Sequence, residues 1–232
     1  MRFITSHPWD LSDRLIDAMA ECPSLCESLH LPVQSGDDEV LRRMGRQYST
    51  EHYLERLDKI RASVPDITVS TDVIVGFCGE TESQFERTLE FLSTVRYDQV
   101  FSAAYSERPG TPATRLADDV PTAEKRRRLQ ALLAVQEPIG LERNRSWLGR
   151  EVEVLVDTIA RERSHDHEES SEAGEESEPR GVRPGPGQVA MSGRTRGNKL
   201  VHLAGPAAWF GSLVPVRIEH AGPYALRGTP VG

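Results

Sequence analysis

The stretch "ITVSTDVIVGF", residues 67–77, decides the fold class of this 232-residue sequence. It is rich in β-branched residues and is bounded by glycine, a pattern that predicts a buried strand. Similar short segments lie at residues 2–6, 28–33 and 98–106. Segments with helical spacing of apolar residues separate these four strands. Alternating strands and helices predict an α/β unit with a parallel sheet and right-handed crossovers.

The helices between these strands carry recognisable start and stop signals. Helices are expected at about 10–21, around 40–44 and at about 50–63. The helix after the strand at 67–77 opens with "TESQ" at 81–84, which fits a capping box. A long basic helix follows Pro121, and Pro138 is expected to kink or break it.

The chain changes character after Gly149. "EVEVLVDT" at 151–158 alternates apolar and polar residues, and further short strands are expected at about 188–192, 199–204 and 212–220. Short alternating strands without helices predict a small antiparallel barrel. The segment at about 161–187 is acidic, rich in Ser, Gly and Pro and poor in apolar residues. We interpret it as a disordered insertion.

Composition restricts the classes of protein to consider. Three cysteines at irregular spacing are no disulfide framework, which indicates a cytoplasmic protein. No apolar run approaches the roughly 18–20 residues that span a bilayer, so no membrane partner is expected. The net charge is −8, yet residues 188–232 hold five basic residues and one acidic residue. This basic end favours a nucleic-acid partner.

Polar and small residues follow each predicted parallel strand. They read "SHP" at 6–8, "PVQSG" at 32–36, "GFCGE" at 76–80 and "SERPGTP" at 106–112. Ligands of α/β sheets gather at the carboxyl ends of the strands, so these clusters indicate one shared site. The alternative is that these residues only form turns, for which Gly, Pro and Ser are well suited.

Five motifs in order resemble the radical S-adenosylmethionine (SAM) methylthiotransferases, most closely the MiaB-type branch. They are "LHLPVQSGDDEVLRRMGRQYS" (29–49), "DVIVGFCGET" (72–81), "SERPGTPA" (106–113), "VPTAEKRRRLQALLAVQ" (120–136) and "SGRTRGNKLV" (192–201). The resemblance implies a partial TIM-like (β/α) radical SAM barrel, its last four strands, in residues 1–145. A small all-β, OB-like TRAM barrel would follow in residues 146–232.

The resemblance also implies binding residues. Those for SAM would be Gln34, Ser35, Gly76, Gly79, Glu80 and Arg108, the arginine being suited to a carboxylate or phosphate. Those for RNA would be Arg194, Arg196, Lys199 and Arg227, which supply phosphate contacts. The aromatic residues Trp209, Phe210 and Tyr224 either stack on bases or fill the barrel core. The resemblance identifies no catalytic residue in this chain.

The cysteines do not fit the clusters that the resemblance implies. Radical SAM methylthiotransferases hold two 4Fe-4S clusters, one of them through C-x-x-x-C-x-x-C. Cys22 and Cys26 have the first spacing, but Leu29 occupies the third position. Cys78 is a lone thiol in a turn where proline is expected, and "HDH" at 165–167 is read as part of a solvated charge run. We therefore expect no metal ligands in this chain.

The expected function is that of a radical SAM tRNA methylthiotransferase. It would add a methylthio group to C2 of N6-isopentenyladenosine beside the anticodon, with SAM and two 4Fe-4S clusters as cofactors. This chain would be a truncated portion, and its partners would be the tRNA anticodon stem-loop, the missing N-terminal half and an electron donor such as flavodoxin or ferredoxin. The alternatives are a sibling enzyme acting on threonylcarbamoyladenosine or a ribosomal protein, and a non-catalytic RNA-binding protein with a vestigial barrel.

Overall fold

A computed structural model describes residues 1–2, 7–160 and 181–231 of the chain. The chain forms two compact units, Met1–Gly140 and Leu141–Gly232. Their boundary falls inside a long helix, slightly before the boundary at 145/146 that the sequence predicted. Residues 3–6 of the predicted first strand and residues 161–180 of the predicted acidic insertion lie outside the described residues.

The first unit contains a parallel sheet. Its described strands are β1 (Ser28–His30), β2 (Thr68–Val75) and β3 (Gln99–Ala104), in the order β1-β2-β3. β2 is therefore central among the described strands, and it covers the run that the sequence predicted as a buried strand. The chain continues alongside β2 after β1, because Gln34 N donates to the carbonyl of Asp72 at 2.9 Å. The predicted α/β class with a parallel sheet is confirmed.

Five helices of the described chain precede, connect or follow these strands: α1 (Asp13–Glu21), α2 (Asp38–Arg43), α3 (Thr50–Ser63), α4 (Glu82–Val95) and α5 (Thr122–Arg145). Short 3₁₀ turns lie at Pro8–Asp10 and Pro112–Arg115. The predicted capping box is present, since Thr81 accepts from the backbone N–H of Gln84 and the Gln84 side chain accepts from that of Thr81.

Of the kink or break predicted at Pro138, the break does not occur, because α5 runs through this residue. An internal proline removes one helical hydrogen bond and costs about 3 kcal/mol. Apolar side chains on either side of it, Leu132 and Ile139, are buried. Burying such side chains contributes roughly 1.5–3 kcal/mol each, which offsets the cost of the proline.

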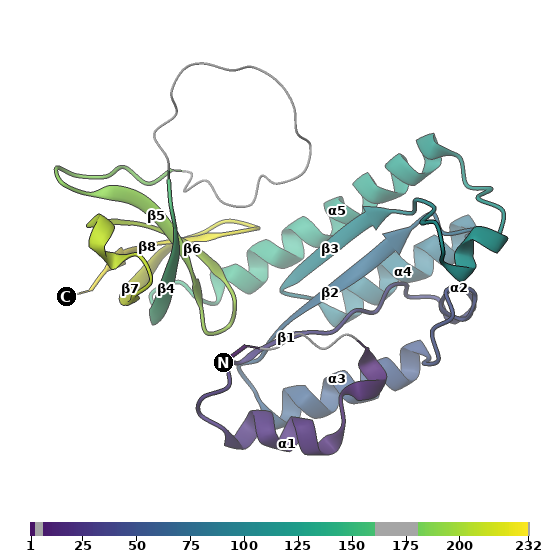
Figure 1. Cartoon of the computed structure of the whole chain (residues 1–232), viewed down its shortest axis with the longest axis horizontal. Helices are drawn as coiled ribbons and strands as arrows, with labels where there is room; N and C mark the ends of the chain where they lie inside the picture. Colours follow the sequence, from purple (N-terminus) through teal and green to yellow (C-terminus); the bar gives the residue numbers. More distant parts are fainter. Residues whose placement is uncertain (3–6, 161–180, 232) are drawn as a thin grey trace. The chain divides into compact units, whose positions relative to one another are not determined.

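The core of the first unit lies on one face of the sheet. Leu29, Val69 and Val73 of the strands share one apolar cluster with Leu57 of α3 and Leu92 of α4. Figure 1 shows α3 and α4 running alongside the strands. The residues that alternate with these on β2 and β3 are less covered, and Phe101 keeps 41% of its surface exposed. The sheet thus presents one packed face and one open face among the described residues.

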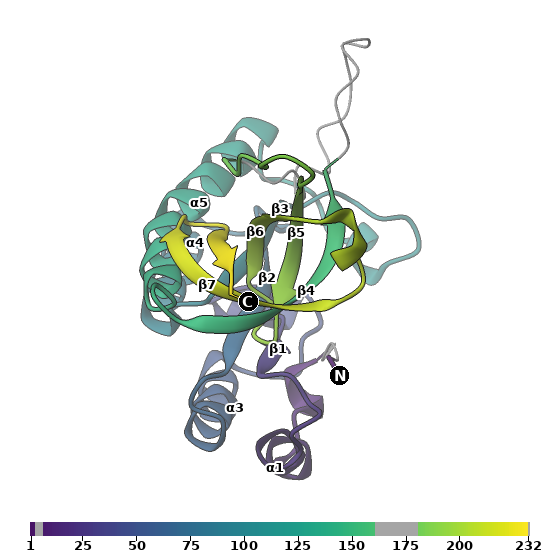
Figure 2. The same ribbon diagram turned by 90° about the vertical axis from the view of Figure 1, so that its left-hand side faces the viewer.

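The second unit is a closed five-stranded barrel (Figure 2). Its strands are β4 (Glu151–Ile159), β5 (Val189–Thr195), β6 (Leu200–Gly205), β7 (Leu213–Ala221) and β8 (Leu226–Pro230), and a 3₁₀ turn lies at Ala207–Trp209. They close in the order β4-β5-β6-β8-β7. All pairs are antiparallel except β6 with β8. The predicted barrel is confirmed, with one parallel pair and with β8 as a strand that the sequence pattern did not predict.

Gly36 provides a test of the packing in the first unit. A Cβ atom at Gly36 would lie 2.7 Å from the Cβ of Phe91 and from the Cα of Thr88, both in α4. We expect Gly36→Ala to lower the free energy of unfolding by about 1–3 kcal/mol, since the helix must move away. Urea denaturation measures this change. Ser93→Ala, on the exposed side of α4, is the control and should stay within about 0.5 kcal/mol of the parent. Equal effects of the two substitutions would contradict the packing described here.

Candidate functional site

A cleft of about 480 Å³ lies at the carboxyl ends of β2 and β3 in the first unit. It is lined by the connection after β1, by the chain after α2, by strand β2, and by strand β3 with the loop that follows it. The polar side chains lining it are Gln34, Arg46, Asp72, Ser102, Tyr105, Ser106, Arg108 and Thr111. Met44, Ile74, Phe77, Phe101 and Ala113 are among its apolar lining residues. The position agrees with the site expected at this edge of a parallel sheet.

Asp72 is oriented by a histidine from the neighbouring strand. His30 Nε2 lies 3.2 Å from a carboxylate oxygen of Asp72, and His30 Nδ1 lies 2.9 Å from the hydroxyl of Ser70. The His30 ring also packs edge-on against Phe101, with 5.8 Å between ring centroids. Because His30 holds one of its oxygens, the Asp72 carboxylate has a fixed direction on the open face of the sheet. A hydrogen-bond acceptor, the Asp72 carboxylate, and an exposed aromatic ring, that of Phe101, therefore lie next to each other in the cleft.

Two of the six predicted SAM-binding residues line the cleft. Gln34 lines the cleft from the end of the segment that continues alongside β2 after β1. Its backbone is left-handed there, with φ of +70°. Arg108 lines the cleft from the loop after β3. Ser35 does not line it, since Ser35 is fully buried with its hydroxyl 3.3 Å from that of Thr88. The contact of Ser35 in this structure is with α4.

The other three predicted SAM-binding residues form the turn between β2 and α4. Gly76 and Gly79 have φ of +69° and +70°, where glycine is favoured. A Cβ atom at Gly76 would collide with the Lys125 side chain of α5. The Gly76 N–H donates to the Glu80 carboxylate at 2.6 Å, and the Gly79 N–H donates to Asp119 at 2.6 Å. The close approach that Gly76 permits is thus an approach of α5, while at Gly79 an added Cβ atom would collide with the Arg43 side chain of α2.

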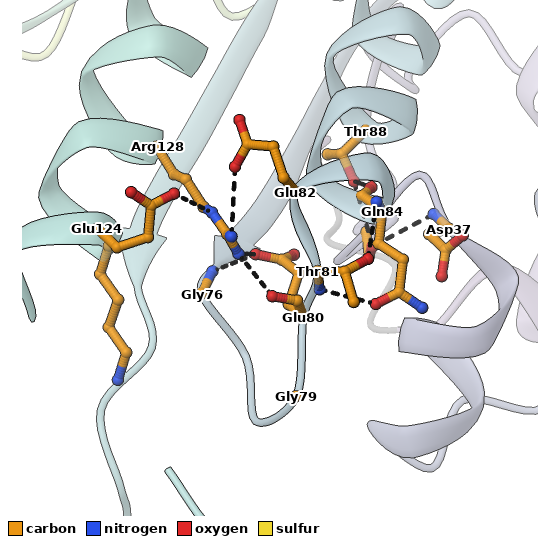
Figure 3. A network of polar contacts seen from close by, with 12 residues as sticks. Asp37, Gly76, Gly79, Glu80, Thr81, Glu82, Gln84, Thr88, Glu124 and Arg128 are labelled. Carbon is orange, nitrogen blue, oxygen red and sulfur yellow. Dashed lines mark hydrogen bonds and ion pairs between the residues drawn. The ribbon is translucent and has the colours of Figure 1, made fainter. Parts of the chain in front are cut away.

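Glu80 is the centre of a buried ion-pair network (Figure 3). Arg128 Nη1 donates to the Glu80 carboxylate at 2.8 Å and to the Glu80 carbonyl at 2.9 Å. Arg128 Nε donates to Glu124 at 2.9 Å within α5. Burial raises the pKa of Glu80 above its usual value, while the Gly76 N–H and Arg128 act in the opposite direction. The network links the turn after β2 to α5. Within it, the carboxylate of Glu80 already accepts hydrogen bonds from Gly76 and Arg128.

The three thiols do not fit a shared cluster. Cys22 is the exposed C-cap residue of α1, and Cys26 lies just before β1, at the amino end of the sheet. Cys78 is buried after β2, at the opposite end, beside Phe77. Leu29, the third position of the cysteine spacing, belongs to the core. In the described ranges, no group of three or more His, Cys, Asp or Glu side chains could hold a metal ion, and "HDH" at 165–167 lies outside those ranges.

Two of the predicted RNA-binding arginines lie beside a buried histidine on the barrel. His202 of β6 pairs with Arg227 of β8 and with Ser192 of β5, and Arg194 is two residues further along β5. Arg194 Nη1 donates to the Asn198 carbonyl at 3.4 Å, and Arg227 Nη1 donates to the Gly181 carbonyl at 2.7 Å. Burial, followed by the charges of Arg227 and Arg194, lowers the pKa of His202. His202 was not among the residues predicted from the sequence, where its only signal is its place in a short predicted strand.

The remaining predicted RNA-binding residues differ in their surroundings. Arg196 is partly exposed in the turn between β5 and β6. Lys199 is buried, and its ammonium donates to the Asn144 side chain at 2.8 Å. Asn144, in the last turn of α5, also donates to the carbonyls of Gly222 and Pro223. Lys199 therefore contributes to the packing of the second unit.

The three aromatic residues singled out in the barrel also divide. Trp209 packs against the barrel core and against Gly205, where an added Cβ atom would collide with the indole ring. Phe210 is 57% exposed, and Tyr224 is 66% exposed in the turn between β7 and β8. Of these three residues, Phe210 and Tyr224 are exposed and Trp209 is partly buried. No helix in the described ranges is both long enough and apolar enough to cross a membrane.

Comparison with known proteins confirms the resemblance. Residues 1–92 match the family described as the radical SAM superfamily. Proteins named tRNA-2-methylthio-N(6)-dimethylallyladenosine synthase from Thermoanaerobacter sp. (strain X514) and Acetivibrio thermocellus are 40% and 41% identical over 98% and 100% of the chain. The protein of that name from Thermus thermophilus is 42% identical over 100% of it. The chain covers 43%, 43% and 44% of these three relatives, less than half of their length.

The buried pair of Glu80 and Arg128 gives a prediction with a pH dependence. We expect Arg128→Met to lower the free energy of unfolding by about 3–5 kcal/mol at neutral pH, since it leaves a buried carboxylate without its partner. Burial without Arg128 raises the pKa of Glu80 further. Stability linked to a raised carboxyl pKa is present at low pH and lost as pH rises through that pKa, so the deficit should shrink on acidification.

Chemical denaturation of the parent and variant at several pH values measures this effect. The double variant Glu80→Met/Arg128→Met removes both charges and should recover most of the loss. A deficit that does not depend on pH, or that persists in the double variant, would contradict the role given to the pair.

Proposed function

We propose that this chain forms part of a tRNA methylthiotransferase, since it is related over its whole length to radical SAM methylthiotransferases. The modification would be a methylthio group at C2 of N6-isopentenyladenosine beside the anticodon. The observation that supports this most is the 40–42% identity to enzymes whose name specifies that nucleoside. Because the chain covers less than half of those enzymes, the complete activity belongs to a longer protein or to an assembly.

The first unit would be the partial radical SAM barrel, with β1, β2 and β3 among its last four strands. Its parallel strand order and its single helix-covered face support this assignment. In such a barrel the open face of the sheet would face the interior. Asp72 and Phe101, partners in the register of β2 and β3, would then lie inside it. The remaining strands of the barrel stay a prediction.

The cleft would hold SAM beside the target nucleoside. SAM would supply the methyl group and the radical chemistry of the family. Gln34 and Asp72 would hydrogen-bond hydroxyl or base-edge groups, and Phe101 would present its ring to a base. Gly76, Gly79 and Glu80 would act indirectly, since their turn positions Phe77 at the cleft. The three thiols do not fit a cluster, so both 4Fe-4S clusters would be held by cysteines of other sequence.

The second unit would be the TRAM barrel, an OB-like module that binds the tRNA anticodon stem-loop. The closing order β4-β5-β6-β8-β7 supports it, since it numbers the strands 1-2-3-5-4. OB-folds bind oligonucleotides on their second and third strands and on the loop between the fourth and fifth. Here those parts carry Arg194 and the exposed ring of Tyr224. Arg196 and Arg227 would add phosphate contacts, and Lys199 would act through the packing of Asn144.

A second candidate function is that of an RNA-binding protein without catalysis. The misfit of the three thiols favours it, because a vestigial barrel needs no cluster. A sibling enzyme for threonylcarbamoyladenosine or a ribosomal protein remains an alternative substrate class. The electron donor, such as flavodoxin or ferredoxin, the missing N-terminal half and the cytoplasmic location also stay predictions.

A chimera separates the catalytic from the non-catalytic reading. This chain would replace the matched segment of the Thermus thermophilus relative, in a strain whose own N6-isopentenyladenosine methylthiotransferase gene is deleted. We expect the chimera to restore the 2-methylthio nucleoside, measured by mass spectrometry of digested tRNA. Reinsertion of the relative's own segment is the positive control. A folded chimera that binds tRNA but leaves the nucleoside unmodified would favour the RNA-binding function.

The histidine beside the barrel arginines gives a local test of RNA binding. The pKa of His202 is lowered by burial and by Arg227 and Arg194. A phosphate bound between these arginines would offset their charge, so the pKa of His202 should rise when RNA binds. NMR titration of the imidazole with and without an anticodon stem-loop RNA measures this shift. In Arg194→Gln/Arg227→Gln the pKa should start higher and respond less to RNA; an unchanged response would contradict the assigned surface.

A further inference from the structure

We propose that Arg46 and Arg108 bind a backbone phosphate of the RNA that enters the cleft. The two residues come from separate loops, after α2 and after β3, and both line the same cleft. The inference rests on the proposed function and adds to it a contact that fixes the RNA beside the site of modification. Arg46 has no assigned role in the resemblance, and Arg108 was assigned there to SAM.

Arg46 has an unused donor inside the first unit. Its Nε is buried and has no hydrogen-bond partner among the described residues. Its backbone is fixed, since Arg46 N donates to the Leu41 carbonyl at 2.9 Å just after the left-handed Gly45. A buried donor without an acceptor costs free energy, and a charged one costs more. Because Nε itself is buried, a ligand in the cleft would contact the terminal nitrogens of the same guanidinium, whose charge no ion pair within the described residues neutralises.

The hydroxyl of Tyr48, which feels the charge of Arg46, does not neutralise this guanidinium. Burial raises the pKa of Tyr48 to about 12, so the phenol stays protonated, although the charge of Arg46 acts in the opposite direction. The hydroxyl of Tyr48 donates to the carbonyls of Pro32 and Val33 at 3.2 and 3.1 Å. Tyr48 thus supports the loop after β1 and leaves the positive charge of Arg46 in place at the cleft.

Arg108 projects from a loop that is closed by its own backbone. The carbonyl of Arg108 accepts from the N–H of Thr111 at 3.3 Å and from its hydroxyl at 2.9 Å. Gly110 supplies the left-handed turn with φ of +85°. The exposed Arg108 side chain is therefore carried by an ordered turn, and it lines the same cleft as a second guanidinium.

The charge of the cleft favours a phosphate over SAM as the ligand of this pair. Among the described residues that line the cleft, Asp72 is the one carboxylate, and it is hydrogen-bonded to His30. Two guanidinium groups against one carboxylate leave an excess of positive charge. SAM carries a sulfonium and an ammonium group besides its carboxylate, so its net charge is positive. An RNA phosphate is an anion, and guanidinium groups bind it in a bidentate manner.

The aromatic lining of the cleft fits the same ligand. Phe101 keeps 41% of its surface exposed, and its ring packs edge-on against His30. Unpaired bases of RNA stack on such rings, while arginines hold the adjoining backbone. The cleft therefore combines a surface for a base with a pair of cations for a phosphate, as an unstacked nucleotide requires.

The test measures the affinity of the 232-residue chain for a synthetic anticodon stem-loop RNA that carries N6-isopentenyladenosine, by fluorescence anisotropy at several salt concentrations. Arg46→Gln and Arg108→Gln should each weaken binding about tenfold and flatten the salt dependence by about 0.7 per lost phosphate contact. The matched control is Arg42→Gln, since Arg42 is exposed, pairs with Glu39 and does not line the cleft. It should bind within about twofold of the parent.

A methylphosphonate scan of the same RNA identifies the phosphate. Replacing the contacted phosphate by the neutral methylphosphonate should weaken binding to the parent chain and cause no further loss in Arg46→Gln. SAM affinity, measured by equilibrium dialysis, should be unchanged in Arg46→Gln and Arg108→Gln. Thermal unfolding of each variant confirms that it is folded.

The barrel variant Arg194→Gln/Arg227→Gln separates failure of this inference from failure of the proposed function. If that variant weakens RNA binding while Arg46→Gln and Arg108→Gln behave like Arg42→Gln, the inference is overturned and the proposed RNA partner stands. If the parent chain itself does not bind the RNA, the proposed RNA partner is overturned; if it binds and no arginine variant weakens binding, the inference is overturned together with the barrel surface assigned above. A loss of SAM affinity without a loss of RNA affinity would assign the pair to the SAM carboxylate and overturn the inference.

Discussion

Burial of the Glu80 carboxylate against the Arg128 guanidinium constrains most of the first unit. The turn between β2 and α4 can take its shape only if α5 brings Arg128 to it, and α5 can approach only because Gly76 has no side chain. The same turn carries Phe77 to the cleft. A buried charge pair of this kind contributes more to the uniqueness of an arrangement than to its free energy, since desolvation offsets much of the attraction.

The packing of α5 against this turn also accounts for most of the basic run in that helix. Four consecutive basic residues, Lys125 to Arg128, look from the sequence like a surface for nucleic acid. Three of them have partners in the first unit: Lys125 pairs with Asp118, Arg127 with Glu82 and Glu124, and Arg128 with Glu80. Their charge is largely neutralised within the fold. The cations of the cleft and of the barrel are better placed to meet an RNA.

The strands and helices of the first unit were predictable because local signals agreed with the tertiary structure. The apolar run of β2 indicated a buried strand, and "TESQ" indicated the start of α4. The sequence could not show that the helix continues through Pro138, because the cost of proline is local, whereas the apolar packing that offsets it comes from distant residues. Strand β8 was missed because "LRGTP" lacks alternation and depends on pairing with β6 and β7. Only the structure could place Gln34 and Arg108 in a cleft, add Arg46 to it, and show Ser35 and Lys199 buried.

The side chain of Asn144 has a consequence for how the barrel can be separated from the rest of the chain. It belongs to the final turn of a helix, yet it accepts from Lys199 and donates to two carbonyls of the turn between β7 and β8. A fragment cut at residue 146, where the sequence changes character, would lack this amide and leave those carbonyls and that ammonium short of a partner. A fragment beginning at Leu141 would keep it. The smallest fragment that keeps all contacts of the barrel therefore includes a piece of helix that its β-rich sequence does not indicate.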